Sequence, residues 1–360
     1  MLERYGHGGD LLTAAETFGM QANDFLDYSS NMNPFGPPAA VRTIFQERWT
    51  DIVKYPDPAV RELRLKIAER YGVPVESVLA GNGAAELIDL VVRMLRPGVT
   101  ALARPSFVEY EEAVHKAGGG ITDIPLYEEN GFELSQEALS EAASRADLLF
   151  LGHPNNPTGR LIPQAVLESA VGSGKRVVLD EAFIDFCPEE EDRSFIRQAA
   201  VSESLFVIRS MTKFFAIPGI RLGFIVAHPD WIAKLRALQV AWSVNTLAQL
   251  IGAEVLADRE YAQKTLDWLQ AERPWLASKL ESLGVRTYPS DTNFMLLRLP
   301  NPERLDVKQL QRTLGERGVL IRDASRFQGL TSAYLRIAIR LRGENERLVS
   351  ELERAFSGMR

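Results

Sequence analysis

Short apolar runs alternate with amphipathic stretches through the middle of the chain. Apolar runs bounded by turn-forming residues are typical of buried strands, and an apolar repeat of about 3.6 residues indicates a helix. We expect helices at Ala84–Leu95 and at Glu137–Arg145, the second opened by a cap at Ser135. The expected strands are Thr100–Ala103, Leu148–Gly152, Arg176–Leu179, Leu205–Arg209 and Leu222–Ala227. This alternation predicts an α/β fold with a mostly parallel sheet covered on both faces.

The pattern changes in the last third of the chain. From Thr246 to about Leu283 it is continuously helical, and Pro274 predicts a break or kink there. Two short strands follow, Asn293–Leu299 and Tyr334–Ile339, with a helix near Asp306–Gly315 between them. These elements predict a second, smaller α+β unit.

Three segments are therefore expected. Residues 1–45, rich in Asn, Gly and Pro, form an arm that packs with the small domain, because chain termini often lie close together. Residues 46–275 form the large α/β domain, and residues 276–360 form the small C-terminal domain.

Composition narrows the class of protein. The chain has 360 residues, 46% of them apolar, which supplies a core for roughly two domains. Its net charge of −7 argues against a nucleic-acid partner. Cys187 is the single cysteine, so no intrachain disulfide forms and a reducing, cytoplasmic location is expected. No leader pattern and no apolar run of about 20 residues is visible, so we expect no membrane association.

Neither the histidines nor the acidic run of the chain is interpreted as a functional site. The four histidines are scattered and lack the spacing of metal ligands, so no metal site is expected. The acidic run 189–192, after Pro188, is interpreted as a solvated loop.

Candidate chemistry falls at the carboxyl ends of the expected strands, where open α/β sheets bind their ligands. The first motif is Gly81-Asn-Gly83-Ala84-Ala-Glu86, which opens a helix. Glycines there let backbone N–H groups approach a phosphate, although a plain tight turn explains the motif equally well. As a dinucleotide fingerprint it fails, because Glu86 occupies the third glycine position.

The next two motifs follow neighbouring strands. His153-Pro-Asn155-Asn156-Pro-Thr-Gly is a rigid turn, but a turn alone gives no reason for paired asparagines. Asp180 ends an apolar strand, where a carboxylate is costly unless it meets a cation or a donor. A structural ion pair and a functional acid remain equal alternatives for Asp180 taken alone.

The fourth motif is Ser210-Met-Thr212-Lys213, followed by Arg221. A lysine close behind a buried strand is a candidate nucleophile, because burial lowers the pKa of its amine. Ser-x-x-Lys also occurs in acyl-serine enzymes, but the Ser-Asp-Asn and Lys-Thr-Gly motifs that those enzymes need are missing. A lysine, a carboxylate, a phosphate cup and an arginine are together what pyridoxal phosphate requires.

At these residues the chain resembles the fold type I pyridoxal-phosphate enzymes, the aspartate aminotransferase superfamily. The resemblance covers nearly the whole chain and implies the aspartate aminotransferase-like transferase fold. It implies that Lys213 forms the Schiff base, that Asp180 pairs with the pyridine nitrogen and that Asn156 bonds the phenolic oxygen. Phe107 matches the aromatic that stacks on the ring, and Tyr55 matches a tyrosine that reaches the cofactor phosphate across a dimer interface. The phosphate cup is matched by Gly83, Ala84, Ser210, Thr212 and Arg221.

Within this superfamily the chain looks most like histidinol-phosphate aminotransferases and the related threonine-phosphate decarboxylases. Phe183 stands where the aminotransferases usually have a tyrosine, and His7-Gly8-Gly9 resembles a segment with which the decarboxylases bind substrate phosphate. Asp10 departs from that pattern, because asparagine is expected after His-Gly-Gly. The substrate residues that the resemblance implies are His7, Gly8, Asn31, Asn156, Arg322 for phosphate and Arg336 for carboxylate.

The resemblance implies a homodimeric, cytoplasmic lyase that decarboxylates a small phosphorylated amino acid, threonine phosphate. A histidinol-phosphate aminotransferase is the alternative, since it shares nearly every cofactor contact. A non-catalytic binding protein on the same fold is a further alternative, against which the intact Lys213, Asp180 and Arg221 argue.

Overall fold

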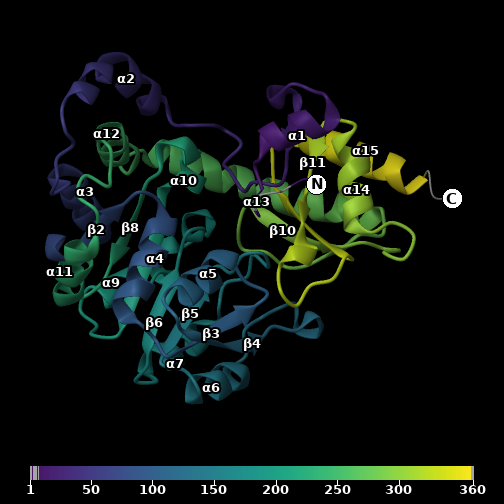
Figure 1. The fold of residues 1–360 in the computed structure, drawn as a ribbon. Helices are drawn as coiled ribbons and strands as arrows, with labels where there is room; N and C mark the ends of the chain where they lie inside the picture. Colours follow the sequence, from purple (N-terminus) through teal and green to yellow (C-terminus); the bar gives the residue numbers. More distant parts are fainter. Residues whose placement is uncertain (1, 3–5, 7, 358–360) are drawn as a thin grey trace.

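The computed structural model describes residues 2, 6 and 8–357 (Figure 1). Its largest element is a seven-stranded sheet of order β2-β8-β7-β6-β5-β3-β4, in which β8 alone runs antiparallel to its neighbours. The strands are β2 (Val78–Gly81), β3 (Val99–Arg104), β4 (Gly120–Pro125), β5 (Leu148–Gly152), β6 (Arg176–Asp180), β7 (Leu205–Ser210) and β8 (Gly223–Val226). The mostly parallel α/β sheet predicted from the sequence is confirmed.

Helices cover both faces of this sheet because its strands are apolar on both sides. Phe150 of β5 packs into a cluster with α4, α5 and α11, whereas its neighbours Leu149 and Leu151 point into a second cluster with α3, α6, α7 and α12. Alternate residues of a strand thus fill two cores. The helices are α1 (Leu11–Phe18), α2 (Ala39–Glu47), α3 (Arg61–Tyr71), α4 (Ala84–Leu95), α5 (Val108–Lys116), α6 (Gln136–Ser144), α7 (Gln164–Gly172), α8 (Glu190–Arg193), α9 (Ile196–Ala199), α10 (Met211–Phe214), α11 (Pro229–Leu238), α12 (Thr246–Val255), α13 (Arg259–Ser282), α14 (Val307–Gly315) and α15 (Arg342–Ser357).

A smaller antiparallel sheet of order β12-β13-β10-β9 lies beside the large one, at the right of Figure 1. Its strands are β9 (Arg286–Thr287), β10 (Phe294–Arg298), β12 (Arg322–Asp323) and β13 (Tyr334–Ala338). The N-terminal region forms a separate two-stranded sheet beside it, in which β1 (Leu26–Asp27) pairs in parallel with β11 (Val319–Leu320). The division of the chain at residues 45/46 and 275/276 stays a prediction.

The long helical segment breaks at a different place from the one predicted. Pro274 lies inside α13, which is continuous from Arg259 to Ser282. The break falls instead between α12 and α13, where the Asp258 side chain accepts a hydrogen bond from Tyr261 N at 2.9 Å and caps the new helix. The proline deletes one backbone hydrogen bond, whereas buried Leu269 and Leu276 on either side of it hold α13 to the core.

The acidic run also differs from the prediction. Residues Glu190–Arg193 form the short helix α8, and Glu190 is not a solvated loop residue. Its carboxylate accepts a hydrogen bond from Arg209 Nη2 at 2.5 Å, and Arg209 is only 1% exposed. Arg209 also pairs with Glu181 at 2.9 Å and with Asp185 at 3.2 Å, because a buried guanidinium needs acceptors. This network ties the ends of β6 and β7 together.

One carboxylate joins the large part of the chain to the small sheet. Glu128, in the segment after β4, accepts hydrogen bonds from Tyr288 at 2.5 Å and Tyr334 at 2.6 Å. Arg286 at 2.9 Å and Arg298 at 3.4 Å complete what we call the Glu128 cluster. Four donors from the β9, β10 and β13 region therefore converge on a single side chain.

Among the residues that the structure describes, no helix is both long and apolar enough to cross a bilayer.

Candidate active site

The lysine and the carboxylate predicted from the sequence lie at the ends of adjacent strands. Asp180 is the last residue of β6, and β7 beside it runs through Ser210 directly into α10, which carries Lys213. Desolvation and the positive charges of Arg221 and Arg336 lower the pKa of Lys213 to about 8, against the attraction of Asp180. A large fraction of this amine is therefore neutral, and so nucleophilic, in mildly alkaline solution.

Asp180 is buried and held by two donors. Burial raises its pKa, whereas hydrogen bonds and the charge of Lys213 act in the opposite direction. Tyr110 Oη donates to Asp180 Oδ2 at 2.7 Å, and Ala182 N donates to Oδ1 at 3.0 Å. Tyr110 was not predicted as a site residue, because its only local signal is its place three residues after Phe107.

The residues of the predicted phosphate cup come together around Gly223. This glycine pairs with Ser210 on one side and with Gly81 on the other, and a Cβ there would lie 2.8 Å from Ala84 N. Glycine at this position lets strand β8 approach the first turn of α4. Gly223 was not recognised in the sequence, since an isolated glycine in a strand has no specific signal.

Two pairs of residues line the cup. Gly83 has a φ of 84° just before α4, and a Cβ there would clash with the guanidinium of Arg221. Ser210 Oγ and Thr212 Oγ1 lie 2.8 Å apart. The cup thus combines a helix N-terminus, two hydroxyls and a guanidinium, which are the groups that bind phosphate.

Two arginines of the small sheet face the same space. Arg322 and Arg336 are directly opposite in the β12–β13 register, so their side chains leave the same face of the sheet. Arg336 Nη1 donates to Asn156 Oδ1 at 2.6 Å, and Nη2 donates to the Ser29 carbonyl at 2.7 Å. These bonds join the small sheet to the asparagine turn that follows β5.

The N-terminal segment closes this end of the site. Arg322 Nη2 donates to the Gly6 carbonyl at 2.6 Å, and Gly9 N donates to Ser29 Oγ at 2.8 Å. Gly8 lies so close to the backbone of Ser29 that a Cβ would overlap its carbonyl. His7, a predicted substrate residue, lies outside the described residues.

Asp10 and Asn31, two polar residues near this segment, were both noted in the sequence. Asp10, which departs from the expected pattern, accepts hydrogen bonds from Thr13 N at 3.1 Å and Thr13 Oγ1 at 2.6 Å as the N-cap of α1. Asn31 is buried, its carbonyl accepts from Asn293 Nδ2 at 3.1 Å, and its own Oδ1 has no hydrogen-bond partner within the described part of the chain. An unpaired buried amide oxygen is costly, so a donor from a ligand would stabilise it.

The two predicted aromatic contacts differ. Phe107 precedes α5 and packs edge-on, with ring centroids 5.7 Å apart, against Tyr110, the residue that donates to Asp180. Tyr55 is 81% exposed and lies against Trp242, with centroids 4.9 Å apart. The single chain therefore brings the predicted residues that the structure describes to one region, with Tyr55 as the exception.

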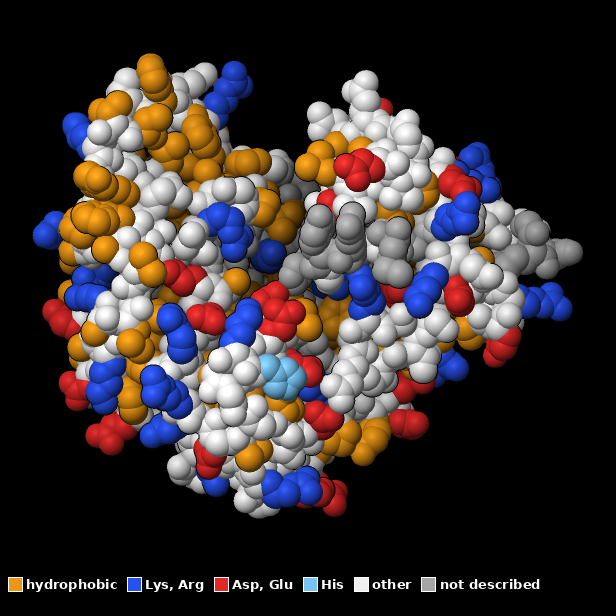
Figure 2. Space-filling model, viewed as in Figure 1, with side chains coloured by type: hydrophobic (Ala, Val, Ile, Leu, Met, Phe, Trp, Pro, Cys, Tyr) orange, Lys and Arg blue, Asp and Glu red, His pale blue; other side chains and the backbone are white. Residues whose placement is uncertain are grey.

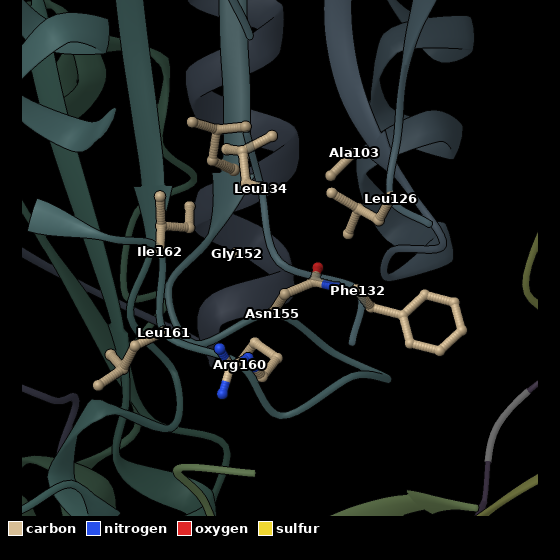
Figure 3. A pocket seen from close by; sticks show the side chains of 10 residues that line it. Ala103, Leu126, Phe132, Leu134, Gly152, Asn155, Arg160, Leu161 and Ile162 are labelled. Carbon is tan, nitrogen blue, oxygen red and sulfur yellow. The ribbon is translucent and has the colours of Figure 1, made fainter. Parts of the chain in front are cut away.

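A small cavity lies beside the site without being part of it (Figure 3). It lies at the ends of β3 and β5 and is lined by Ala103, Leu126, Phe132, Leu134, Leu151, Gly152, Asn155, Arg160, Leu161 and Ile162. Neither Lys213 nor Asp180 contributes to it. Asn155 is the link to the site, because it donates to the Pro105 carbonyl at 3.0 Å and braces the turn before Phe107.

Comparison with known proteins assigns a family. Residues 23–352 match the family described as aminotransferase class I and II. A threonine-phosphate decarboxylase from Salmonella typhimurium is 38% identical over 98% of this chain and 97% of its own length.

Solved structures agree in fold. A histidinol-phosphate aminotransferase from Clostridium acetobutylicum matches with a TM-score of 0.86 and 30% identity, covering 92% of this chain and 99% of that one. An L-threonine-O-3-phosphate decarboxylase from Porphyromonas gingivalis matches with a TM-score of 0.81 and 27% identity over the same shares.

Proposed function

The chain belongs to the class I and II aminotransferase family, and we propose that within it this protein is a pyridoxal-phosphate-dependent carboxy-lyase. Its proposed substrate is L-threonine O-3-phosphate, and its product is (R)-1-amino-2-propanol O-phosphate for cobalamin biosynthesis. The observation that carries this proposal is the pair of opposed arginines, Arg322 and Arg336, of which Arg336 bonds the asparagine turn and acts on Lys213. The similarity to a threonine-phosphate decarboxylase over nearly the whole chain supports it.

The residues of the site fit pyridoxal phosphate. Gly83, Ala84, Ser210, Thr212 and Arg221 would hold its phosphate, because Gly83 leaves room for the Arg221 guanidinium where a side chain would clash. Phe107 would stack on the ring. When bound, the cofactor withdraws electrons from the bonds around the substrate's α-carbon.

Two residues would supply the chemistry on the protein side. Lys213, whose amine is easily deprotonated here, would bind the cofactor covalently and exchange it for the substrate amine. Asp180 would hold a proton on the ring nitrogen through its carboxylate. Asn156 would bond the phenolic oxygen with its amide group, while its Oδ1 stays paired with Arg336. As a free amine, Lys213 would also be the proposed proton donor to the α-carbon.

The opposed arginines suit a substrate with two anionic ends. Arg336 would bind the carboxylate, since its hydrogen bond to Asn156 places it close to the cofactor-binding turn. Arg322 would bind the phosphate together with Gly8, Asn31 and the predicted His7. Fixing both ends limits rotation about the substrate's N–Cα bond, which keeps one scissile bond aligned with the ring.

A histidinol-phosphate aminotransferase is the second candidate. The observation in its favour is the similarity of the fold to the Clostridium acetobutylicum structure. Histidinol phosphate has no carboxylate, so Arg336 would have that acceptor only in the half of the reaction that uses 2-oxoglutarate. Phe183 also packs edge-on against Phe294 at 4.9 Å and has no hydroxyl to offer the cofactor.

The two candidates make different products, and one assay separates them. The holoenzyme is given threonine phosphate or histidinol phosphate, the latter with 2-oxoglutarate. Release of carbon dioxide from threonine phosphate supports the proposal. Formation of glutamate from 2-oxoglutarate with histidinol phosphate, without carbon dioxide from threonine phosphate, contradicts it.

Replacing Arg322 with alanine tests the phosphate assignment. We expect a rise in KM for threonine phosphate of about ten- to a hundredfold, because one charge-assisted contact contributes about 1.5–3 kcal/mol. The effect on unphosphorylated threonine should be much smaller. Steady-state kinetics on both substrates measure this, with Arg312→Ala, an exposed arginine on α14 that pairs with Glu316, as a control. Equal losses on both substrates would show that the phosphate is bound elsewhere.

An exposed apolar surface supports a homodimer. Large apolar side chains gather over α2 and the segments around it, at the upper left of Figure 2. They are Phe45, Trp49, Ile52, Val53, Tyr55, Leu238, Val240 and Trp242. Patches of this kind mark protein–protein contacts, and two-fold pairing is the commonest way to bury one. Tyr55 within this surface would reach the partner's cofactor phosphate.

Mixing two inactive variants tests the shared site. Lys213→Ala and Tyr55→Ala are each expected to be inactive or nearly so, but a hybrid dimer contains one site with both residues intact. Random pairing makes half of the dimers hybrids, so about a quarter of the wild-type activity should return. Refolding the mixed chains and assaying turnover measures it. No recovery, or a fully active monomer in sedimentation, contradicts the shared site.

A further inference from the structure

Tyr110 reaches Asp180 across an intervening strand. Tyr110 stands on the first turn of α5, which follows β3, whereas Asp180 ends β6. Strand β5 lies between β3 and β6, and its residue opposite Asp180 is Gly152. A Cβ on Gly152 would lie 3.3 Å from Tyr110 Oη and 3.1 Å from Asn155 Cα. The missing side chain therefore opens the path along which the phenol meets the carboxylate.

The phenol is held rigidly at this position. Tyr110 is 2% exposed, and its ring stacks on Phe150 with centroids 4.3 Å apart at 20°. Phe107 packs edge-on against the same ring at 5.7 Å. The hydroxyl donates to Asp180 Oδ2 at 2.7 Å. A buried hydroxyl that is fixed by ring packing donates without paying the entropy of ordering a mobile side chain.

The Tyr110 hydroxyl favours the carboxylate form of Asp180 against the effect of burial. Burial raises its pKa, and what opposes burial comes from the Tyr110 hydroxyl on α5, the Ala182 N–H and the charge of Lys213 on α10. Lys213 in turn faces Arg221 and Arg336. Once Lys213 is neutral, its attraction for Asp180 is lost, and the two neutral donors remain.

We propose that Tyr110 is a positioning residue that fixes the Asp180 carboxylate toward the cofactor's ring nitrogen. The proposal rests on the proposed use of pyridoxal phosphate. Tyr110 occupies one oxygen of the carboxylate and Ala182 N the other, so the orientation of both is set before any ligand arrives. Preorganised donors of this kind cost no reorganisation during the reaction.

The test compares Tyr110→Phe with Tyr28→Phe. Both remove one buried phenol hydroxyl, but Tyr28 donates to Asn345 Oδ1 at 3.1 Å in the small part of the chain, away from Asp180. Phenylalanine keeps the ring stack on Phe150. Each holoenzyme is titrated with pH while its visible absorbance is followed, and kcat, KM and Tm are measured.

In Tyr110→Phe we expect the pH midpoint of the absorbance change to rise by about one unit. Without the phenol, Asp180 is less well oriented and its charged form is less favoured, so less positive charge stays on the ring. We expect kcat to fall about tenfold with KM unchanged. Tyr28→Phe should lose a similar amount of thermal stability and keep the wild-type midpoint.

Three results overturn the inference. An unshifted midpoint in Tyr110→Phe, with lower Tm, shows that the residue is structural only. An equal shift in Tyr28→Phe shows a general effect. A Tyr110→Phe variant that behaves as wild type shows that Ala182 N alone orients Asp180. If the wild type takes up no pyridoxal phosphate, the proposed function fails. If the wild type takes it up and the Tyr110→Phe midpoint does not shift, only this inference fails.

Discussion

Replacing Lys213 with alanine is expected to abolish turnover while leaving the fold intact. The side chain is partly buried at the end of a short helix, and among the described residues it lies in no ion pair within 4.0 Å. Its amine is the group that would bind the cofactor, and its lowered pKa of about 8 makes it reactive. Alanine removes this nucleophile without creating a large void, so activity should fall below detection at an unchanged Tm.

Borohydride reduction followed by peptide mapping locates the attachment. The wild-type protein should carry a pyridoxyl label on the peptide that contains Lys213, and the variant should carry none. Lys264→Ala serves as the control, because Lys264 is exposed on α13 with its ammonium 4.2 Å from the centre of the Phe35 ring. A label on any other lysine contradicts the assignment.

Replacing Asp180 with asparagine should have the second largest effect. Asparagine has the same shape and can still accept from Ala182 N, so packing and the 3.0 Å contact survive. The negative charge is lost, and a neutral amide cannot keep a proton on the ring nitrogen. Loss of one preorganised electrostatic group costs about 10²–10³ in kcat.

The measurement is kcat together with the affinity for pyridoxal phosphate. Asp185→Asn is the matched control, because Asp185 is a carboxylate five residues further along the chain that pairs with Arg209 at 3.2 Å and not with Tyr110. The control should lose thermal stability and keep its rate within a fewfold. A wild-type rate in Asp180→Asn would remove Asp180 from the site.

Local sequence patterns were sufficient to predict the helices and strands whose burial is uniform along their length. Helix α4 begins and ends at the predicted residues, and Ser135 caps α6 as predicted, with Oγ accepting from Ala138 N at 3.2 Å. Strand β5 also matches, because a strand buried on both faces is a continuous apolar run. The predicted break at Pro274 was wrong, because packing along α13, and not the local effect of proline, decides whether the helix continues.

The site likewise contains residues that local patterns could predict and residues that they could not. Lys213, Asp180 and the cup residues follow strands directly, so their positions could be inferred from the order of the motifs. Tyr110 could not be inferred, because its partner is 70 residues away in sequence and the contact depends on the sheet order. The opposition of Arg322 and Arg336 likewise exists only through the β12–β13 register. Non-local pairing of this kind has no signature in a short window of sequence.

The Glu128 cluster separates two effects of pH that would otherwise overlap. Desolvation raises the pKa of Glu128, but Tyr288, Tyr334, Arg298 and Arg286 together hold it below its ordinary value of 4.5. A depressed carboxyl pKa stabilises the native state above the ordinary value, and that stabilisation is lost only as the pH falls through the lower one. The link between the large part and the small sheet is therefore at full strength throughout the range around pH 8 in which Lys213 titrates. A pH–rate profile measured there therefore contains no contribution from the protonation of Glu128.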